Sequence, residues 1–289
     1  MQFKRIAVVK LKGGFGNQLF QIMFINNLKN SGMKVLIDTS FFNYKNSKFK
    51  KNNLTKRELV LSLDTFELVR TNPILIYIFN ISFHILKKLN FKFKNKLIAN
   101  TFYGHEYDPK KLGYLNIFDG YWKNPEILIK NINYMFNSLY SIEEFKKEIN
   151  KKPESNSLMI HIRRTDFIDN GWSLSEEFYI DSIEKILSIK GDQKIDIYTD
   201  DGNWVENSKI YQNFKIRNIH SENRSENPFF TFLKMLNYEN FIIGNSTFAF
   251  FPAYLKAKVN SVVIFPDPWF KNSTHPKIAK NNWISVPNK

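Results

Sequence analysis

Residues 158–166, Leu-Met-Ile-His-Ile-Arg-Arg-Thr-Asp, decide how this chain folds and where its chemistry lies. The apolar run 158–160 predicts a buried strand, and His161 and a charged segment follow it directly. Adjacent arginines cannot be buried without partners, so we expect the strand to deliver them to a cleft at its carboxyl end, where α/β folds bind ligands. A guanidinium offers several donors in a rigid fork, which suits a phosphate or diphosphate.

The two arginines are expected to have different roles. Adjacent side chains on a strand point to opposite faces, so Arg163 is predicted to face the cleft and Arg164 to brace the loop. The simpler alternative is a salt-bridged strand end in which Asp166 only pairs with an arginine.

Composition narrows the possible function classes. The 289 residues suffice for two domains of ordinary size or one large domain, and 43% hydrophobic and 16% aromatic residues support a substantial core. The absence of cysteine excludes disulfides, thiolate catalysis and Cys-ligated zinc. A net charge of +15 suggests an anionic partner: nucleic acid, a membrane surface or a phosphorylated substrate. Lysines cluster at 48–51, 87–88 and 92–96, without zinc-finger spacing or an RNP-like motif, so nucleic-acid binding is the weaker interpretation.

The segment 74–86 is the most hydrophobic in the chain. It has 13 residues and contains Asn80, Ser82 and His84, so it should not span a bilayer. It is either a core helix or an interfacial helix that rests on anionic lipid. The N-terminal residues 1–10 do not resemble a signal peptide.

Alternation of strands and helices predicts an α/β chain with parallel sheets. In the N-terminal half we expect strands at 6–9, 34–38 and 116–122, and helices from about 17, from 124–125 and over 141–151. In the C-terminal half we expect strands at 158–162, 195–199, 241–244 and 261–265, and helices at 176–188, 228–236 and 247–257. The polar stretch 153–157 is the best boundary, which gives two Rossmann-like domains, 1–153 and 154–289, with a cleft between them.

A glycine-rich turn, residues 13–18, follows the first strand and opens a helix. Gly14 and Gly16 would let a ligand approach the backbone at a helix N-terminus. The amides of Asn17 and Gln18 could then hold a phosphate or a sugar hydroxyl. The spacing matches neither the dinucleotide fingerprint nor a Walker motif, and the alternative is a plain turn with Asn17 as N-cap.

Two further strand ends carry polar side chains. Asp200 and Asp201 end a strand, and without a third ligand they do not suffice for a metal site. One could cap the helix before Trp204, and one could accept the paired donors of a guanine edge. At the third strand end, Ser246 and Thr247 lie at a helix start, which suits a phosphate or simple capping.

Together these segments resemble bacterial α-1,2-fucosyltransferases, glycosyltransferase family 11. The matching motifs are GG-x-GNQ-x-FQ at 13–21, H-x-RR-x-D at 161–166, the "SDD" strand end at 199–201, the "NSTFSWW" turn at 245–251 and P-x-x-WF at 266–270. The departures are Phe250-Phe251 in place of a Trp pair, Thr165 where Gly is common, and Thr199 in place of Ser. The stretch 41–115 matches least.

The resemblance implies a GT-B-like, inverting enzyme that needs no metal or other cofactor. It would move L-fucose from GDP-β-L-fucose to O2 of a terminal β-galactoside on a surface glycan or its precursor, such as lipopolysaccharide O-antigen. The donor would bind in the C-terminal domain 154–289, and the N-terminal domain 1–153 would present the acceptor.

The resemblance also suggests roles for the motif residues. Arg163 would clamp the β-phosphate, where negative charge builds as the diphosphate leaves, and Arg164 and Asp166 would order it. Asp200 or Asp201 would read guanine. The remaining donor-site residues are expected to be Asn17, which would act with Arg163 and Asp166 in catalysis, and Gly14, Gly16, Gln18, His161, Asn245, Ser246 and Thr247. The base is not evident; the candidates are Asp169, His105, Glu106, Asp119 and the leaving phosphate itself.

Two alternatives stay open. One is a transferase for a related GDP-6-deoxyhexose, or with another linkage or acceptor; the other is a non-catalytic basic module that binds nucleotides or nucleic acid. The positive charge and segment 74–96 further suggest a cytoplasmic protein that makes peripheral contact with the anionic inner face of the membrane.

Overall fold

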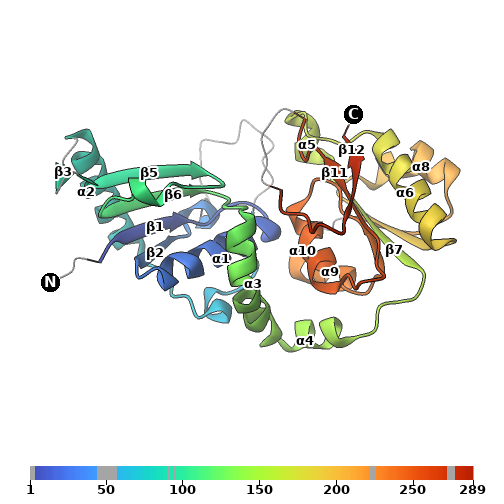
Figure 1. Ribbon diagram of the computed structural model, residues 1–289, viewed down its shortest axis with the longest axis horizontal. Helices are drawn as coiled ribbons and strands as arrows, with labels where there is room; N and C mark the ends of the chain where they lie inside the picture. Colours follow the sequence, from blue (N-terminus) through green and yellow to red (C-terminus); the bar gives the residue numbers. More distant parts are fainter. Residues whose placement is uncertain are drawn as a thin grey trace. The chain divides into compact units, whose positions relative to one another are not determined.

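The computed structural model describes residues 4–43, 57–89, 92–93, 96–221, 226–271 and 277–288. The chain forms two compact units; the first runs to Ile142 and the second begins at Glu143 (Figure 1). The lysine cluster at 48–51 and part of the cluster at 92–96 lie outside the described residues. No helix in the described ranges is long and apolar enough to cross a membrane.

The first unit is built on a parallel sheet with the order β2-β1-β6-β5. The strands are β1 (Ile6–Lys10), β2 (Lys34–Asp38), β5 (Ala99–Gly104) and β6 (Leu115–Gly120). A short antiparallel pair, β3 (Lys92–Phe93) and β4 (Lys96–Leu97), and three 3-10 turns, η1 (Ser40–Asn43), η2 (Leu63–Phe66) and η3 (Pro109–Lys111), complete the connections.

Helices cover both faces of this sheet because successive strand residues alternate between them. On one face Phe118 contacts Phe24 of α1 (Phe15–Asn30), which packs against α3 (Pro125–Tyr140). On the other face Val8 and Ile117 form a core with α2 (Pro73–Lys88) (Figure 1). The expected helices and strands of this half are therefore present, and β5 is the strand that the irregular composition concealed.

The start of α1 differs from the expected N-cap at Asn17. The helix begins at Phe15 with Gly14 in the N-cap position, and no side chain caps it. Gly13 precedes it with φ of +81°, a conformation that favours glycine. Asn17 therefore lies inside the first turn.

The second unit contains a six-stranded parallel sheet with the order β12-β11-β10-β7-β8-β9. Its strands are β7 (Ser157–Ile162), β8 (Lys194–Thr199), β9 (Ile216–Ser221), β10 (Asn240–Ile242), β11 (Val263–Asp267) and β12 (Ile284–Pro287). Its helices are α4 (Glu143–Asn150), α5 (Thr165–Asp169), α6 (Glu176–Lys190), α7 (Gly202–Glu206), α8 (Lys209–Asn213), α9 (Pro228–Met235) and α10 (Thr247–Lys256). All six residues of β7 are buried, as expected of a central strand.

The unit boundary lies before α4 rather than in the polar stretch 153–157. Phe145 of α4 is fully buried and its ring stacks 6.5 Å from that of Phe232 in α9. The Lys256 ammonium also donates to the carbonyls of Ile149 and Lys151, at 2.7 and 2.6 Å. These contacts join α4 to the second unit, which the loop-like composition of 153–157 could not indicate.

Two parallel-sheet α/β units confirm the expected fold class, a GT-B-like chain with two Rossmann-like domains. The cleft between the domains stays a prediction.

Candidate active site

The strand ends of β7 and β8 bring the arginine and aspartate motifs together. The two strands are parallel neighbours, and Ile162 is paired with Thr199. Both polypeptide segments therefore leave the sheet at the same edge. Because β7 ends at Ile162, the alternating faces of a strand do not separate the two arginines that follow.

Arg163 is held between two carboxylates. Its Nε and Nη2 lie 2.9 and 2.8 Å from Oδ1 of Asp166, and its Nη1 lies 3.1 Å from Oδ2 of Asp200. The guanidinium carbon is 5.9 Å from the centroid of the Phe167 ring. The Arg163 side chain is only 13% exposed, so these partners fix its orientation.

Asp200 is committed to the arginine loop. Besides Arg163, its carboxylate accepts hydrogen bonds from the backbone N–H of Arg164, at 2.8 Å, and from the hydroxyl of Thr165. Its side chain is 5% exposed. These contacts engage both carboxylate oxygens and favour a positioning role over the expected contact with guanine.

Asp201 and Arg164 form a second pair. The Asp201 carboxylate accepts a hydrogen bond from the backbone N–H of Trp204 at 3.2 Å, which confirms the N-capping interpretation for this residue. Its other oxygen lies 3.3 Å from Nε of Arg164, whose guanidinium lies 3.8 Å from the centroid of the Trp204 ring. This stacked and paired arginine braces the loop, as expected.

His161 is buried beside the arginines and is neutral. Burial, then the charge of Arg163, lower its pKa to about 4, although Asp200 acts in the opposite direction. Its ring is 5.9 Å from that of Phe248, and within the described ranges its Nδ1 atom is buried without a hydrogen-bond partner. Buried polar atoms are rarely left unsatisfied, so this nitrogen is a candidate ligand contact.

The turn after β10 packs against the end of β7. A Cβ at Gly244, where φ is +54°, would lie 2.9 Å from the carbonyl oxygen of His161. Asn245 donates to the carbonyl of Trp172 at 2.7 Å, and Ser246 caps α10. The Asn245 and Ser246 side chains thus hold this turn in place, and Thr247 lies half-buried in the first turn of α10; their contacts with the donor stay predictions.

The glycine-rich turn belongs to the first unit, and there Gln18 is a structural residue. Its side chain is buried, donates to the carbonyls of Gly13 and Glu58 at 3.0 and 2.8 Å, and accepts from the N–H of Val60 at 3.1 Å. These partners give Gln18 a role in shaping the turn, and its contact with the donor stays a prediction.

Cations that the sequence did not single out surround this turn. A Cβ at Gly13 would lie 3.1 Å from the Tyr121 ring, and the ammonium groups of Lys12 and Lys123 lie 5.2 and 5.3 Å from that ring's centroid. Arg57 lies 3.9 Å from the Cβ position of Gly14. Burial lowers the pKa of Lys123 to about 7. These isolated basic residues come together only through the fold.

The candidate bases lie in different environments. Asp119 is paired with Lys10 at 3.0 Å and Lys12 at 2.5 Å; burial opposes their effect, but the lysines lower its pKa and make it a weak base. Burial and the charge of Lys123 lower the pKa of His105 to about 4, with the same consequence.

The two other candidate bases are exposed carboxylates. Glu106 accepts a hydrogen bond from the side chain of Asn124 at 3.2 Å, and Asp169 ends α5 close in sequence to the arginine motif. Neither is paired with a lysine or arginine among the ion pairs described, so both stay candidates for the base.

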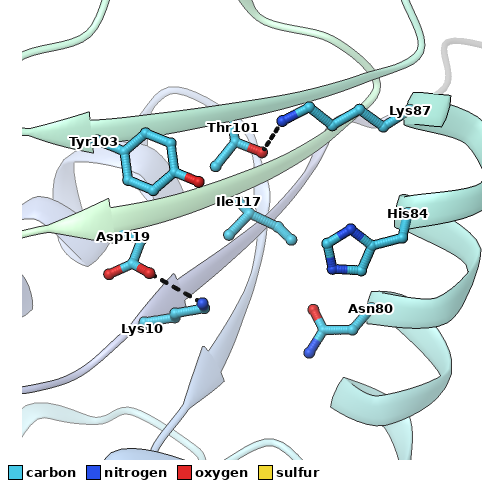
Figure 2. Close-up of a pocket in the computed structure, with 8 residues that line it drawn as sticks. All are labelled: Lys10, Asn80, His84, Lys87, Thr101, Tyr103, Ile117 and Asp119. Carbon is cyan, nitrogen blue, oxygen red and sulfur yellow. Dashed lines mark hydrogen bonds and ion pairs between the residues drawn. The ribbon is translucent and has the colours of Figure 1, made fainter. Parts of the chain in front are cut away.

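A cavity of about 150 Å³ lies within the first unit (Figure 2). It opens where β1, β5 and β6 end, beneath α2, and is lined by Lys10, Asn80, His84, Lys87, Thr101, Tyr103, Ile117 and Asp119. Within the described ranges, no group of three or more histidine or carboxylate side chains is arranged to hold a metal ion.

Comparisons with known proteins cover nearly the whole chain. The family model described as glycosyl transferase family 11 matches residues 6–287. An O-antigen biosynthesis glycosyltransferase, WbnK of Escherichia coli, is 27% identical across 96% of this chain and 99% of the relative. An alpha-1,2-colitosyltransferase of Escherichia coli is 26% identical across 97% and 99%. Among solved structures, the fucosyltransferase NodZ from Bradyrhizobium aligns with a TM-score of 0.41 and 12% identity, covering 87% of this chain and 92% of that one.

Proposed function

Because this chain belongs to glycosyl transferase family 11, and so is a glycosyltransferase, we propose that it transfers L-fucose from GDP-β-L-fucose to O2 of a terminal β-galactoside. Family membership displaces the alternative of a non-catalytic nucleotide- or nucleic-acid-binding module. The name of the relative WbnK supports an acceptor in O-antigen biosynthesis, and hence a cytoplasmic site of action.

The observation that carries this proposal is Arg163 fixed between Asp166 and Asp200. In glycosyl transfer the sugar becomes oxocarbenium-like as its bond to the leaving group weakens, and negative charge grows on the departing diphosphate. A donor group already held in position stabilises that charge without reorganisation. Oriented donors of this kind contribute about 3–4 kcal/mol to the barrier.

The arginine cluster supplies orientation rather than surplus positive charge. Arg163 and Arg164 are matched by Asp166, Asp200 and Asp201, so the carboxylates outnumber the guanidinium groups. The diphosphate therefore needs further cations or backbone donors. In this proposal those donors come from the positions expected to contact it: Gly14, Gly16, Asn17 and Thr247. His161 retains a buried Nδ1 atom that suits a polar group of the nucleoside.

A second candidate is the same linkage with a different donor sugar. One relative is named an alpha-1,2-colitosyltransferase and resembles the chain about as closely as WbnK does. The fold and the diphosphate-binding residues would serve either donor, so the choice depends on contacts to the sugar.

The test is release of GDP from a panel of GDP-sugars with β-galactoside acceptors, with and without a chelator, followed by NMR assignment of the new linkage. We expect the highest kcat/KM with GDP-fucose, an α-1,2 product and no loss of rate with the chelator. Turnover of another GDP-sugar without any turnover of GDP-fucose would overturn the donor assignment, and a product linked elsewhere would overturn the linkage.

A further inference from the structure

Helix α2 carries large apolar side chains on two opposite faces but buries only one of these faces. Ile76 and Phe83 are buried against the first unit's sheet, with Phe79 and Leu86 packed beside them. The remaining large apolar side chains of the helix and its C-cap are each at least 44% exposed: Ile74, Leu75, Tyr77, Ile78, Ile81, Ile85 and Leu89. We call these seven residues the outer face of α2.

The outer face is continuous. At 100° per residue, Ile74, Ile78, Ile81 and Ile85 fall in one stripe along the helix, opposite Ile76 and Phe83. Single exposed apolar residues are common on protein surfaces, but a contiguous row of them marks an interaction site. A helix of 16 residues is roughly 24 Å long, so the stripe is too extended for a small ligand.

Charge identifies the partner. The helix contains no carboxylate, and Lys87 and Lys88 occupy its last turn. The chain carries a net charge of +15. Lys88 falls beside Ile81 and Ile85, whereas Lys87 is turned to the inner side, where its ammonium donates to the hydroxyl of Thr101 at 2.8 Å. An apolar face with a basic residue at its end matches a membrane interface that contains anionic lipids, where the apolar side chains enter the acyl boundary and Lys88 meets the headgroups.

We propose that α2 lies in the plane of an anionic membrane surface with its outer face in the headgroup region. The chain would bind the membrane peripherally, since α2 is too short to span it. This attachment would hold a glycosyltransferase at the surface where lipid-linked glycans are found, and it requires no particular donor or linkage.

Vesicle sedimentation tests this proposal. The full chain is mixed with vesicles of phosphatidylcholine alone, or with about 30% phosphatidylglycerol to supply anionic charge. The test variant is I78E/I81E, and the control is I129E, which places a carboxylate at an exposed apolar position on α3. All three positions are exposed, so thermal melts should show retained folding.

We expect wild type and I129E to sediment with the anionic vesicles and I78E/I81E to bind at least about tenfold more weakly. Binding of wild type should also fall with added salt and on neutral vesicles. Equal binding of all three proteins, or no binding by wild type, would overturn the proposal. A concentration-dependent dimer that only I78E/I81E abolishes would also overturn it and identify a second copy as the partner.

A second, independent observation concerns the cavity beneath the inner flank of α2. Asn80 and His84 project from the helix toward the strands, where Asp119 and Tyr103 stand (Figure 2). Among the described residues, Oδ1 of Asn80 is a buried acceptor with no hydrogen-bond partner. Tyr103 is 69% exposed although it lines the cavity.

This combination suits a sugar. Hydroxyl groups can donate to Oδ1 of Asn80 and to the Asp119 carboxylate, and an exposed aromatic ring offers a flat surface for the sugar's C–H face. Asp119 is paired with Lys10 and Lys12, and Lys87 donates to Thr101, so the cavity offers sugar hydroxyls both hydrogen-bond donors and acceptors. We infer that the cavity binds a sugar unit of the acceptor; this inference rests on the proposed glycosyl transfer.

Saturation-transfer NMR with lactose tests the cavity without requiring turnover. We expect a signal with wild type and with Y211A, a control at an exposed tyrosine of the second unit, and a loss of at least about tenfold in affinity with N80L and Y103A. In transfer assays, the same two variants should raise the acceptor KM and leave the donor KM unchanged. Lactose binding by wild type that neither variant weakens, or no lactose binding at all, would overturn the inference. The donor panel described above fails or succeeds independently of this result.

Discussion

Replacing Asp200 with asparagine separates two roles for this carboxylate. Its Oδ2 lies 3.1 Å from Nη1 of Arg163, which corresponds to an attraction of about 5 kcal/mol at an effective dielectric constant of 20. Removing one partner of a buried ion pair costs about 3–5 kcal/mol. Arg163 keeps Asp166, and the new amide keeps one acceptor oxygen, so we expect the lower end, about 3 kcal/mol, in the free energy of unfolding.

The matched control is D201N. Asparagine caps helices as well as aspartate does, so the bond from the N–H of Trp204 should persist. Only the partly exposed pair between Asp201 and Arg164 is weakened, which should cost less than about 1 kcal/mol.

The assays are urea unfolding and calorimetric binding of GDP and IDP, because IDP lacks the exocyclic amine of guanine. If Asp200 positions Arg163, D200N should weaken GDP and IDP by the same factor, about ten- to a hundredfold, and lower stability more than D201N does. Unchanged stability together with lost discrimination between GDP and IDP would refute this reasoning and return Asp200 to the role of guanine reader.

Three other substitutions test the packing and electrostatics. The folded-state pKa of His161, about 4, lies below the ordinary 6.5, so the unfolded chain takes up the proton first and stability falls as pH drops. In urea titrations, wild type should therefore lose about 2 kcal/mol more unfolding free energy between pH 7 and 5 than H161N does. The same dependence of unfolding free energy on pH in both proteins would contradict the assignment. The pKa of Lys123 is likewise lowered, to about 7, so charge at this buried site destabilises the fold near neutrality. K123M should therefore raise the free energy of unfolding by about 3 kcal/mol at pH 7 and by less at pH 10. A destabilised K123M variant would show that Lys123 has a compensating partner. A Cβ at Gly120 would lie 2.2 Å from the carbonyl oxygen of Gly104, so G120A should lower the free energy of unfolding by at least about 3 kcal/mol. At the control position Gly32 no atom lies within 4 Å of a Cβ, so G32A should lower it by about 1 kcal/mol, from the positive φ alone.

The sequence predicted well those features that depend on local pattern. Apolar runs identified β7, β8 and β10, and the meeting of the 161–166 and 200–201 segments follows from the rule that parallel neighbours end at one edge. Asp201 as a helix cap was one of the two interpretations open for that residue. These features need only periodicity and chain direction.

Other features depended on tertiary contacts that no local pattern records. The backbone groups that bind the side chain of Gln18 belong to Glu58 and Val60, 40 and 42 residues away in the chain. Lys123 gave no signal because its significance arises from burial near the glycine-rich turn. The sequence analysis missed the edge strand β9 because polar residues interrupt its apolar pattern. Two of them, Arg217 and Asn218, donate hydrogen bonds to Asp196 of the neighbouring strand β8.

The central claim is that Arg163, fixed by two carboxylates, stabilises the leaving diphosphate of a GDP-sugar. The most direct measurement is kcat/KM for GDP-fucose transfer by R163K, which keeps the charge but loses the planar fork, alongside R163A. The kcat/KM of both variants should fall by about 10²–10³-fold or more. R163K should retain a cooperative thermal transition like that of wild type. Transfer by folded R163K and R163A at rates close to wild type would contradict the account.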